Sequence, residues 1–150
     1  CHDRLAHWIR LRPAEIVAAM VRIHQFTIMS APTTAQTAAL YALRHGEEQV
    51  QMMVKEYDRR RRLIVDGFNH IGLPTFEPKG AFYAFPKISV TGLDDETFAT
   101  RLLEEEQVAM VPGNAFGAGG DGFCRASYAT NYNKIEEALR RIERFAHRLD

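Results

Sequence analysis

The sequence predicts a fold of the α/β class, an α+β small domain in which helices pack on a small sheet. Three observations predict it. Apolar residues recur at helical spacing along the first half of the chain and near its end, and aromatic residues cluster in short runs between them. Of the 150 residues, 46% are apolar, which is enough for the core of one domain.

Three helices are expected first, at residues 14–29, 33–43 and 47–71. The first and third carry apolar stripes at helical spacing. Pro32 separates the first from the second, because proline disfavours helical backbone in the residue before it. Thr33 or Thr34 is a suitable N-cap for the second helix. Gly72 ends the third, since glycine readily adopts the left-handed conformation at a helix terminus.

Short strands are expected at residues 75–77, 81–85, 108–111 and 123–128. The run AFYAF at residues 81–85 has the aromatic density of a strand that is buried on at least one face. Two further helices are expected at residues 94–106 and 133–149. Asn133 is expected to cap the last one, with Glu136 three residues later completing a capping box.

The charge balance argues against nucleic acid and against an anionic membrane as partners, because 19 basic residues face 19 acidic ones. Four consecutive arginines, residues 59–62, spread around the circumference of a helix, which predicts a solvated surface rather than one basic patch. No apolar run reaches membrane-spanning length. A reducing cytoplasm is the expected location of a chain with two cysteines and no disulfide framework.

Cysteine and histidine residues indicate no metal site. The two cysteines, Cys1 and Cys124, form no metal-binding spacing, and the six histidines are scattered. Cys124 has two interpretations. It is either a thiol whose pKa is lowered by the adjacent Arg125 or a small apolar residue of a strand.

The candidate site lies in the stretch VPGNAFGAGGDGFCRASYATN, residues 111–131. Its glycine-rich loop lacks the Lys-Ser/Thr pair of a phosphate-binding loop, so a flexible turn between two strands is expected. Arg125 follows within a strand, where a buried guanidinium needs an anionic partner. Two partners remain possible, an internal carboxylate or a bound ligand, because the planar fork of arginine holds a carboxylate through two hydrogen bonds.

Three segments carry a family resemblance in a specific order. They are RIHQFTIMSAPTTAQTAALYAL (residues 22–43), PKGAFYAFP (residues 78–86) and VPGNAFGAGGDGFCRASYAT (residues 111–130). Together they resemble the C-terminal portion of the class I/II pyridoxal-phosphate-dependent aminotransferases of fold type I, in the aspartate/aromatic branch. The match runs from about Pro13 to the end. It implies that residues 13–150 are the small domain with its interdomain helices, and that the chain is a fragment.

The resemblance implies transfer of an amino group between an amino acid and a 2-oxo acid, with pyridoxal phosphate as cofactor, in a homodimer. In this family the arginine of the FCRASYA stretch binds the substrate α-carboxylate, so Arg125 becomes the candidate substrate-binding residue. Ser30 aligns with a position near the cofactor phosphate of the neighbouring subunit. The alternative is a serine that ends a helix.

The resemblance also implies that the catalytic Schiff-base lysine is missing, because it precedes the matching segment in the family. The lysines of this chain occupy none of the family's lysine positions: Lys55, Lys79, Lys87 and Lys134. The chain alone is therefore expected to be inactive in transamination and to bind pyridoxal phosphate poorly.

Three alternatives remain open for the function. A β-lyase or synthase of the same fold would use Arg125 equally well. A non-catalytic, aminotransferase-like domain of a transcription regulator would carry the same motifs. An inactive truncated chain would expose the apolar faces of the helices at residues 14–29 and 47–71, which favours aggregation.

Residues 1–12, CHDRLAHWIRLR, depart from the family pattern. One coding choice for them, read one nucleotide later, translates to AMTGWRIGYACA, which resembles the family segment that contains its phosphate-binding arginine. We therefore expect residues 1–12 to be an out-of-frame, non-native segment, joined to the correct frame near Pro13.

Overall fold

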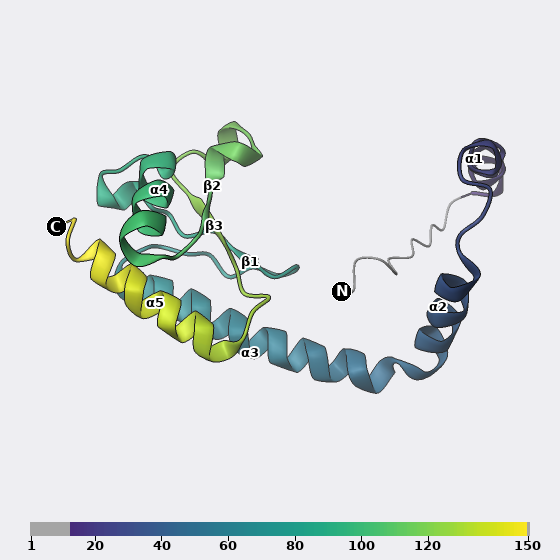
Figure 1. Ribbon diagram of the computed structural model, residues 1–150, viewed down its shortest axis with the longest axis horizontal. Coiled ribbons are helices and arrows are strands. Elements are labelled where there is room, and N and C mark those ends of the chain that lie inside the picture. Colours follow the sequence, from purple (N-terminus) through teal and green to yellow (C-terminus); the bar gives the residue numbers. More distant parts are fainter. Residues whose placement is uncertain (1–12, 150) are drawn as a thin grey trace. The chain divides into compact units, whose positions relative to one another are not determined.

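The computed structural model describes residues 13–149, which divide into two compact units between Met52 and Met53. Figure 1 shows the helices and strands of both units. The segment that was expected to be out of frame, residues 1–12, lies outside the described residues.

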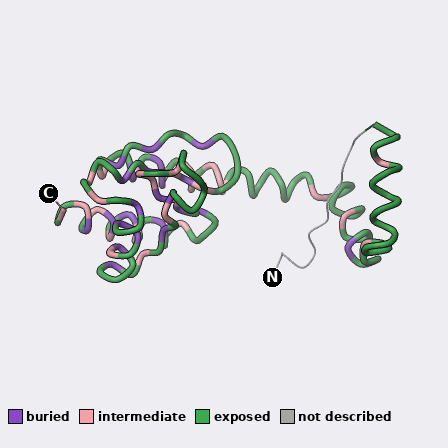
Figure 2. Tube along the Cα trace, turned by 90° about the horizontal axis from the view of Figure 1, so that it is seen from above, coloured by how far each residue is buried: buried purple, intermediate pink, exposed green. Residues whose placement is uncertain are grey.

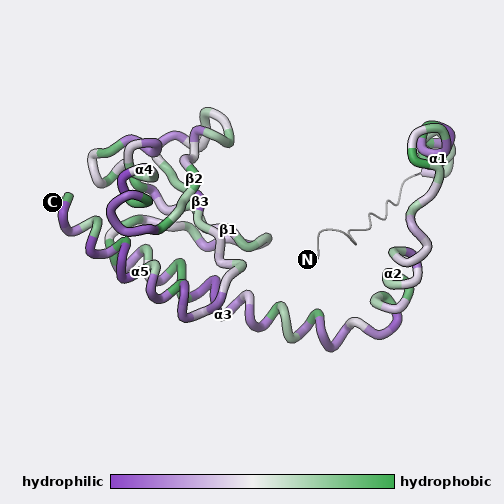
Figure 3. Tube along the Cα trace, in the orientation of Figure 1, coloured by the Kyte–Doolittle hydropathy of each residue, from purple (hydrophilic) through white to green (hydrophobic). Residues whose placement is uncertain are grey.

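The first unit contains α1 (Ala14–Thr27), α2 (Thr33–His45) and the start of α3 (Glu47–Ile71). Within the described residues, α1 buries no side chain and α2 buries only Ala35. Figure 2 shows this unit as almost entirely exposed, and Figure 3 marks hydrophobic stretches along both helices. Ile23 is 71% exposed and Phe26 is 87% exposed. The expected exposure of the apolar face of residues 14–29 is confirmed.

Helix α3 has the bounds that its sequence predicts, but only its second half is packed. Ile64, Val65 and Phe68 are buried, whereas Val50 and Val54 in its first half are exposed. The expected exposure of this helix is therefore confirmed for its first half and wrong for its second. The stripe of apolar residues continues through both halves, so periodicity alone could not separate them.

The second unit contains a three-stranded sheet in the order β1-β3-β2. β3 (Cys124–Ser127) is central and pairs antiparallel with β1 (Tyr83–Ala84) and with β2 (Val111–Pro112). These strands are shorter than the sequence predicts. Ala81 has a φ of 56°, which interrupts the expected strand at residues 81–85. Of the expected strand at residues 75–77, only Thr75 forms a bridge, with Pro86.

The core of the second unit lies between this sheet and three helices, which Figure 1 shows beside one another. Most of the buried side chains come from α4 (Asp95–Glu106), α5 (Tyr132–Ala146) and the second half of α3. Phe98 of α4 is fully buried, and its ring centroid lies 5.3 Å from that of Phe145 on α5 at an interplanar angle of 79°. Edge-to-face contact of this kind adds to the free energy of burying the two rings.

Two of the capping predictions are wrong. Neither Thr33 nor Thr34 caps α2, because Pro32 precedes the helix and no side-chain cap forms. Asn131 caps α5 through a side-chain oxygen that accepts a hydrogen bond from the Asn133 backbone at 3.0 Å. Asn133 itself already lies in the first turn of the helix, so its own side chain is too far along the chain to cap it.

Glu106, the last residue of α4, forms hydrogen bonds with arginines on α5 and just after it. Its buried carboxylate accepts hydrogen bonds of 2.8 Å from Arg144 and 2.8 Å from Arg148, and its backbone carbonyl accepts one of 3.1 Å from Arg141. A negative charge at the C-terminal end of a helix is unfavourable by itself, because the helix dipole is negative there. Arg141 and Arg144 of α5, with Arg148 two residues after its end, therefore offset both the dipole and the burial of Glu106.

These arginines make the stability of the second unit depend on pH. Hydrogen bonds from Arg148 and then Arg144 lower the pKa of Glu106 below its ordinary value of 4.5, although burial opposes them. The pKa of Glu106 is lower in the folded protein than in the unfolded chain. The resulting stabilisation is therefore fully present above pH 4.5 and is lost as the pH falls through the pKa of the folded state.

We expect urea unfolding to show a smaller loss of stability for Glu106→Gln than for the parent between about pH 6 and pH 3. The exposed neighbour variant Glu104→Gln should behave as the parent does. Equal losses in all three proteins would contradict this role.

Candidate functional site

The strand β3 presents two different faces. Cys124 and Ala126 are buried against the core, whereas Arg125 is half-buried and Ser127 is exposed on the other face. This alternation follows from the pleat of a strand, which turns successive side chains to opposite sides. Arg125 therefore stands on the face of the sheet that the helices do not cover.

The guanidinium of Arg125 is held between aromatic rings. Its central carbon lies 4.3 Å from the ring centroid of Tyr83 and 4.2 Å from that of Phe116. Among the ion pairs of residues 13–149, none involves Arg125. The internal carboxylate partner, one of the two possibilities raised by the sequence, is therefore absent from the described residues. The apolar sequence around Arg125 suggested a buried side chain, but Arg125 is only half-buried.

The glycine-rich loop connects β2 to β3, as expected, through two tight turns. They are η3 (Gly113–Phe116) and η4 (Ala118–Gly120). Gly113 and Gly120 pack so closely that a Cβ atom on Gly113 would lie 2.0 Å from the carbonyl oxygen of Gly120. The positive φ values in this loop are at Gly117 and Gly122.

The loop is also fixed to helix α4. The backbone N–H of Asn114 donates to the Asp95 carboxylate at 2.7 Å, and its side-chain amide donates to Glu96 at 2.8 Å. These bonds hold η3, and with it Phe116, at the edge of the sheet beside Arg125. The loop thus positions an aromatic ring, and its glycines allow the two turns to come into contact.

Cys124 lies next to Arg125 in sequence but on the opposite face of β3. It is fully buried, and burial together with the nearby Asp95 raises its pKa to about 12. The interpretation of Cys124 as a thiol of lowered pKa is therefore wrong, and the interpretation as a small apolar strand residue is confirmed. The pleat separates the thiol from the positive charge that would have stabilised its thiolate.

Cys124 should consequently resist alkylation in the folded protein. A pKa near 12 instead of the ordinary 9.0 lowers the thiolate fraction at pH 8 by roughly a thousandfold, and the thiolate is the nucleophile. We expect mass spectrometry of the peptide that contains Cys124 to show slow reaction with iodoacetamide in buffer and rapid reaction in urea. Equal rates in both conditions would contradict the buried position.

Ser30 and Arg125 belong to different units. Ser30 is exposed in the connection between α1 and α2, three residues after α1 ends, and its backbone N–H donates to the Ile28 carbonyl at 3.0 Å. The proposed contact with a cofactor phosphate would come from another subunit and stays a prediction.

The lysines of the chain are dispersed over the surface. Lys55 lies on α3, Lys79 in the loop before β1, Lys87 just after β1, and Lys134 on α5. The guanidinium of Arg125 lies against the rings of Tyr83 and Phe116. Lys87 forms an antiparallel bridge with Phe123, two residues before Arg125, and so lies on the same face of the sheet as Arg125.

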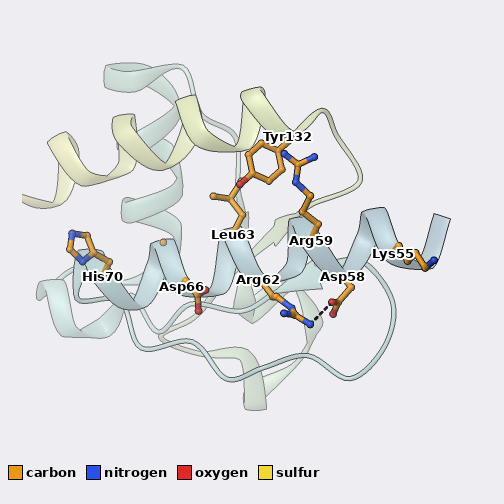
Figure 4. A pocket seen from close by; sticks show the side chains of 9 residues that line it. Lys55, Asp58, Arg59, Arg62, Leu63, Asp66, His70 and Tyr132 are labelled. Atoms are coloured by element: carbon orange, nitrogen blue, oxygen red, sulfur yellow. Dashed lines mark ion pairs between the residues drawn. The ribbon is translucent and has the colours of Figure 1, made fainter. Parts of the chain in front are cut away.

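A separate open groove of about 810 Å³ runs along α3 and the start of α5 (Figure 4). Arg59 lies over the Tyr132 ring at 3.9 Å, and Arg62 forms a 2.8 Å ion pair with Asp58. All four consecutive arginines have acidic partners on α3. The run therefore forms no single basic patch. The expected solvated surface is confirmed for Arg59 and Arg62, which are exposed, and wrong for Arg60 and Arg61, which are half-buried.

The described residues contain no group of three histidine, cysteine or acidic side chains arranged to hold a metal ion. Among the helices of residues 13–149, none combines the length and apolar character needed to span a bilayer.

Comparison with known proteins identifies the relatives of this chain. The sequence profile of the family described as "Aminotransferase class I and II" matches residues 7–142. The aspartate aminotransferase of Pyrococcus abyssi is 47% identical over 134 residues, which are 88% of this chain and 34% of that protein. The aromatic-amino-acid aminotransferase 2 of Thermococcus litoralis is 45% identical over 134 residues, with the same shares of 88% and 34%.

Solved structures agree with the sequence matches. The crystal structure of the aromatic aminotransferase from Pyrococcus horikoshii OT3 superposes with a TM-score of 0.86 at 45% identity, over 92% of this chain and 38% of that one. The aspartate aminotransferase of Thermotoga maritima superposes with a TM-score of 0.82 at 38% identity, over 91% of this chain and 34% of that one. The chain therefore spans about a third of the length of the curated relatives it matches.

Proposed function

Because the chain belongs to the class I and II aminotransferases, we propose that it supplies the substrate-carboxylate contact of an enzyme that transfers amino groups between amino acids and 2-oxo acids. Arg125 makes that contact. The observation that carries the proposal is the half-buried guanidinium on the open face of the sheet, which has no acidic partner among residues 13–149.

The chemistry of arginine suits this task. A guanidinium offers five N–H donors in a fixed plane and binds a carboxylate through two parallel hydrogen bonds. Two bonds fix the orientation of the substrate as well as its position. An amino acid held in this way can present its Cα–H bond in the direction that proton removal requires, which lowers the entropic part of the barrier.

The family depends on pyridoxal phosphate, which acts as an electron sink when it is bound. The described surroundings of Arg125 do not hold this cofactor by themselves, because aromatic rings occupy both flanks of the guanidinium. Lys87, the lysine on the same face of the sheet, occupies none of the family's lysine positions. We therefore assign to Arg125 the binding and orientation of a carboxylate and no further step. We also propose that Ser30 approaches the cofactor phosphate of a neighbouring subunit in a homodimer, as the family resemblance implies.

The test uses a hybrid enzyme in which residues 13–150 replace the aligned segment of the Pyrococcus abyssi aspartate aminotransferase. We expect the hybrid to transaminate amino acids to 2-oxo acids, and the 150-residue chain alone to show no transamination when pyridoxal phosphate is added. A folded, cofactor-loaded hybrid without transamination would contradict the proposed function. Product analysis separates amino transfer from β-elimination, since only elimination releases ammonia.

We propose in addition that residues 1–12 are an out-of-frame reading. The test is a confirmed DNA sequence across the first codons and the region upstream. We expect the frame one nucleotide later to encode the AMTGWRIG segment, preceded within a few codons by a lysine. A confirmed sequence that lacks this frame would overturn the proposal.

A further inference from the structure

We propose that Tyr83 and Phe116 are positioning residues that hold the Arg125 guanidinium in place while leaving its hydrogen-bond donors free for a carboxylate ligand. This inference rests on the proposed function of Arg125, and it adds how the guanidinium is held in place while its N–H donors stay free for the ligand. Tyr83 and Phe116 are called the aromatic pair below.

Arg125 needs a restraint that leaves its hydrogen-bond donors unoccupied. A carboxylate partner would fix the guanidinium, but it would also occupy two donors and neutralise the charge. The face of an aromatic ring attracts the cation through its quadrupole and competes much less for the N–H groups. Since the guanidinium carbon lies 4.3 Å and 4.2 Å from the two ring centroids, the aromatic pair can restrain Arg125 without consuming its binding capacity.

The two rings reach Arg125 from opposite sides of β3. β3 is the central strand, and Tyr83 lies on β1, where it pairs with Ser127 on one side of β3. Phe116 lies in the turn that follows β2, the strand on the other side of β3. The guanidinium is therefore restrained from both edges of the sheet, which limits the rotamers of a long side chain.

Neighbouring groups support each ring of the aromatic pair. The Phe116 ring contacts Phe85 edge-on at 5.8 Å, and its turn is fixed by the bond from Asn114 to Asp95. The Tyr83 ring lies 4.7 Å from that of Phe82. Support of this kind keeps a binding group near its productive geometry.

The expected size of the effect follows from typical cation–π interactions. Loss of one ring should weaken carboxylate binding roughly 2- to 30-fold, and loss of both should weaken it more than either. The substitutions Tyr83→Phe and Phe116→Tyr keep an aromatic face and should therefore retain most of the affinity. If the two rings only filled space, leucine and an aromatic replacement at these half-exposed positions would change the carboxylate affinity by similar amounts.

The test is an NMR titration of the 150-residue chain labelled with ¹⁵N. The Nε–Hε resonance of Arg125 is identified by its loss in Arg125→Lys, and 2-oxoglutarate is the titrant. We expect this resonance to shift saturably in the parent, in Tyr83→Phe and in the control Phe76→Leu, whose ring is 64% exposed. In Tyr83→Leu and Phe116→Leu we expect the dissociation constant to rise roughly 2- to 30-fold.

The outcomes separate this inference from the proposed function. If the Arg125 resonance of the parent does not respond to 2-oxoglutarate, the carboxylate contact itself is wrong. If it responds equally in the parent and in both leucine variants, only the positioning role is overturned. Should the isolated chain aggregate, the same variants in the hybrid enzyme decide the matter, because loss of the aromatic pair should raise KM by the same factor and an unchanged KM would reject it.

Discussion

Replacing Arg125 with glutamine is expected to lower kcat/KM of the hybrid enzyme by roughly 30- to 5,000-fold. Removing one partner of a desolvated, hydrogen-bonded charge pair typically costs about 2–5 kcal/mol. Each 1.36 kcal/mol corresponds to about a tenfold change in rate. Glutamine keeps the approximate length of the side chain but loses the charge and the second parallel donor, so both the affinity for the carboxylate and its orientation suffer.

The distribution of this loss between kinetic constants carries information. If Arg125 binds the carboxylate equally in the ground state and the transition state, KM rises and kcat is unchanged. If it also orients the Cα–H bond, kcat falls as well. We expect both changes. Arg125→Lys should recover only part of the loss, because an ammonium keeps the charge but not the planar fork.

The matched control for Arg125 is a substrate rather than a second variant. Ethylamine lacks the α-carboxylate of alanine, so its slow single-turnover reaction should be nearly insensitive to Arg125→Gln. A similar penalty for alanine and ethylamine would indicate that Arg125 supports the fold or the cofactor instead. Unfolding curves of the parent and variant hybrids check that the substitution leaves the protein folded.

The second large effect is expected at Phe98. This ring is fully buried and contacts Phe145 edge-on at 5.3 Å, so Phe98→Ala removes the ring and leaves a cavity between α4 and α5. Substitutions of this type cost about 3–5 kcal/mol. That is a large share of the total stability of a domain, which is about 5–15 kcal/mol. Urea unfolding of the 150-residue chain should show the loss as a lower midpoint with a similar slope.

Phe76→Ala is the control for Phe98→Ala. Phe76 is 64% exposed, and exposed substitutions usually change stability by less than about 0.5 kcal/mol. If Phe98→Ala lowers the free energy of unfolding as little as Phe76→Ala does, Phe98 is not part of a packed core.

The sequence was informative about helices because their signals are local. The bounds of α3 could be predicted since its apolar stripe, its acidic start and Gly72 all lie within the segment. The short strands were harder. The left-handed conformation of Ala81 and the position of Pro112 at the sheet edge depend on neighbours in space, and those neighbours shorten the strands.

The candidate site was predicted in part. The alternation in FCRAS places Arg125 on a strand, and the family resemblance suggests its role. The sequence could not reveal what holds the guanidinium, because Tyr83 and Phe116 reach it from two other elements on either side of β3. The sequence-based expectation that a buried arginine needs an anionic partner did not consider that aromatic rings can also hold the guanidinium in position.

The most direct test of the central claim is a crystal structure of the hybrid enzyme with maleate, a dicarboxylate that cannot react. We expect one maleate carboxylate to lie in the plane of the Arg125 guanidinium, with two N···O distances of about 2.7–2.9 Å. Tyr83 and Phe116 should keep their contacts with Arg125 in that complex. An acidic side chain from the rest of the enzyme paired with Arg125, with maleate bound elsewhere, would contradict the carboxylate-binding role of Arg125.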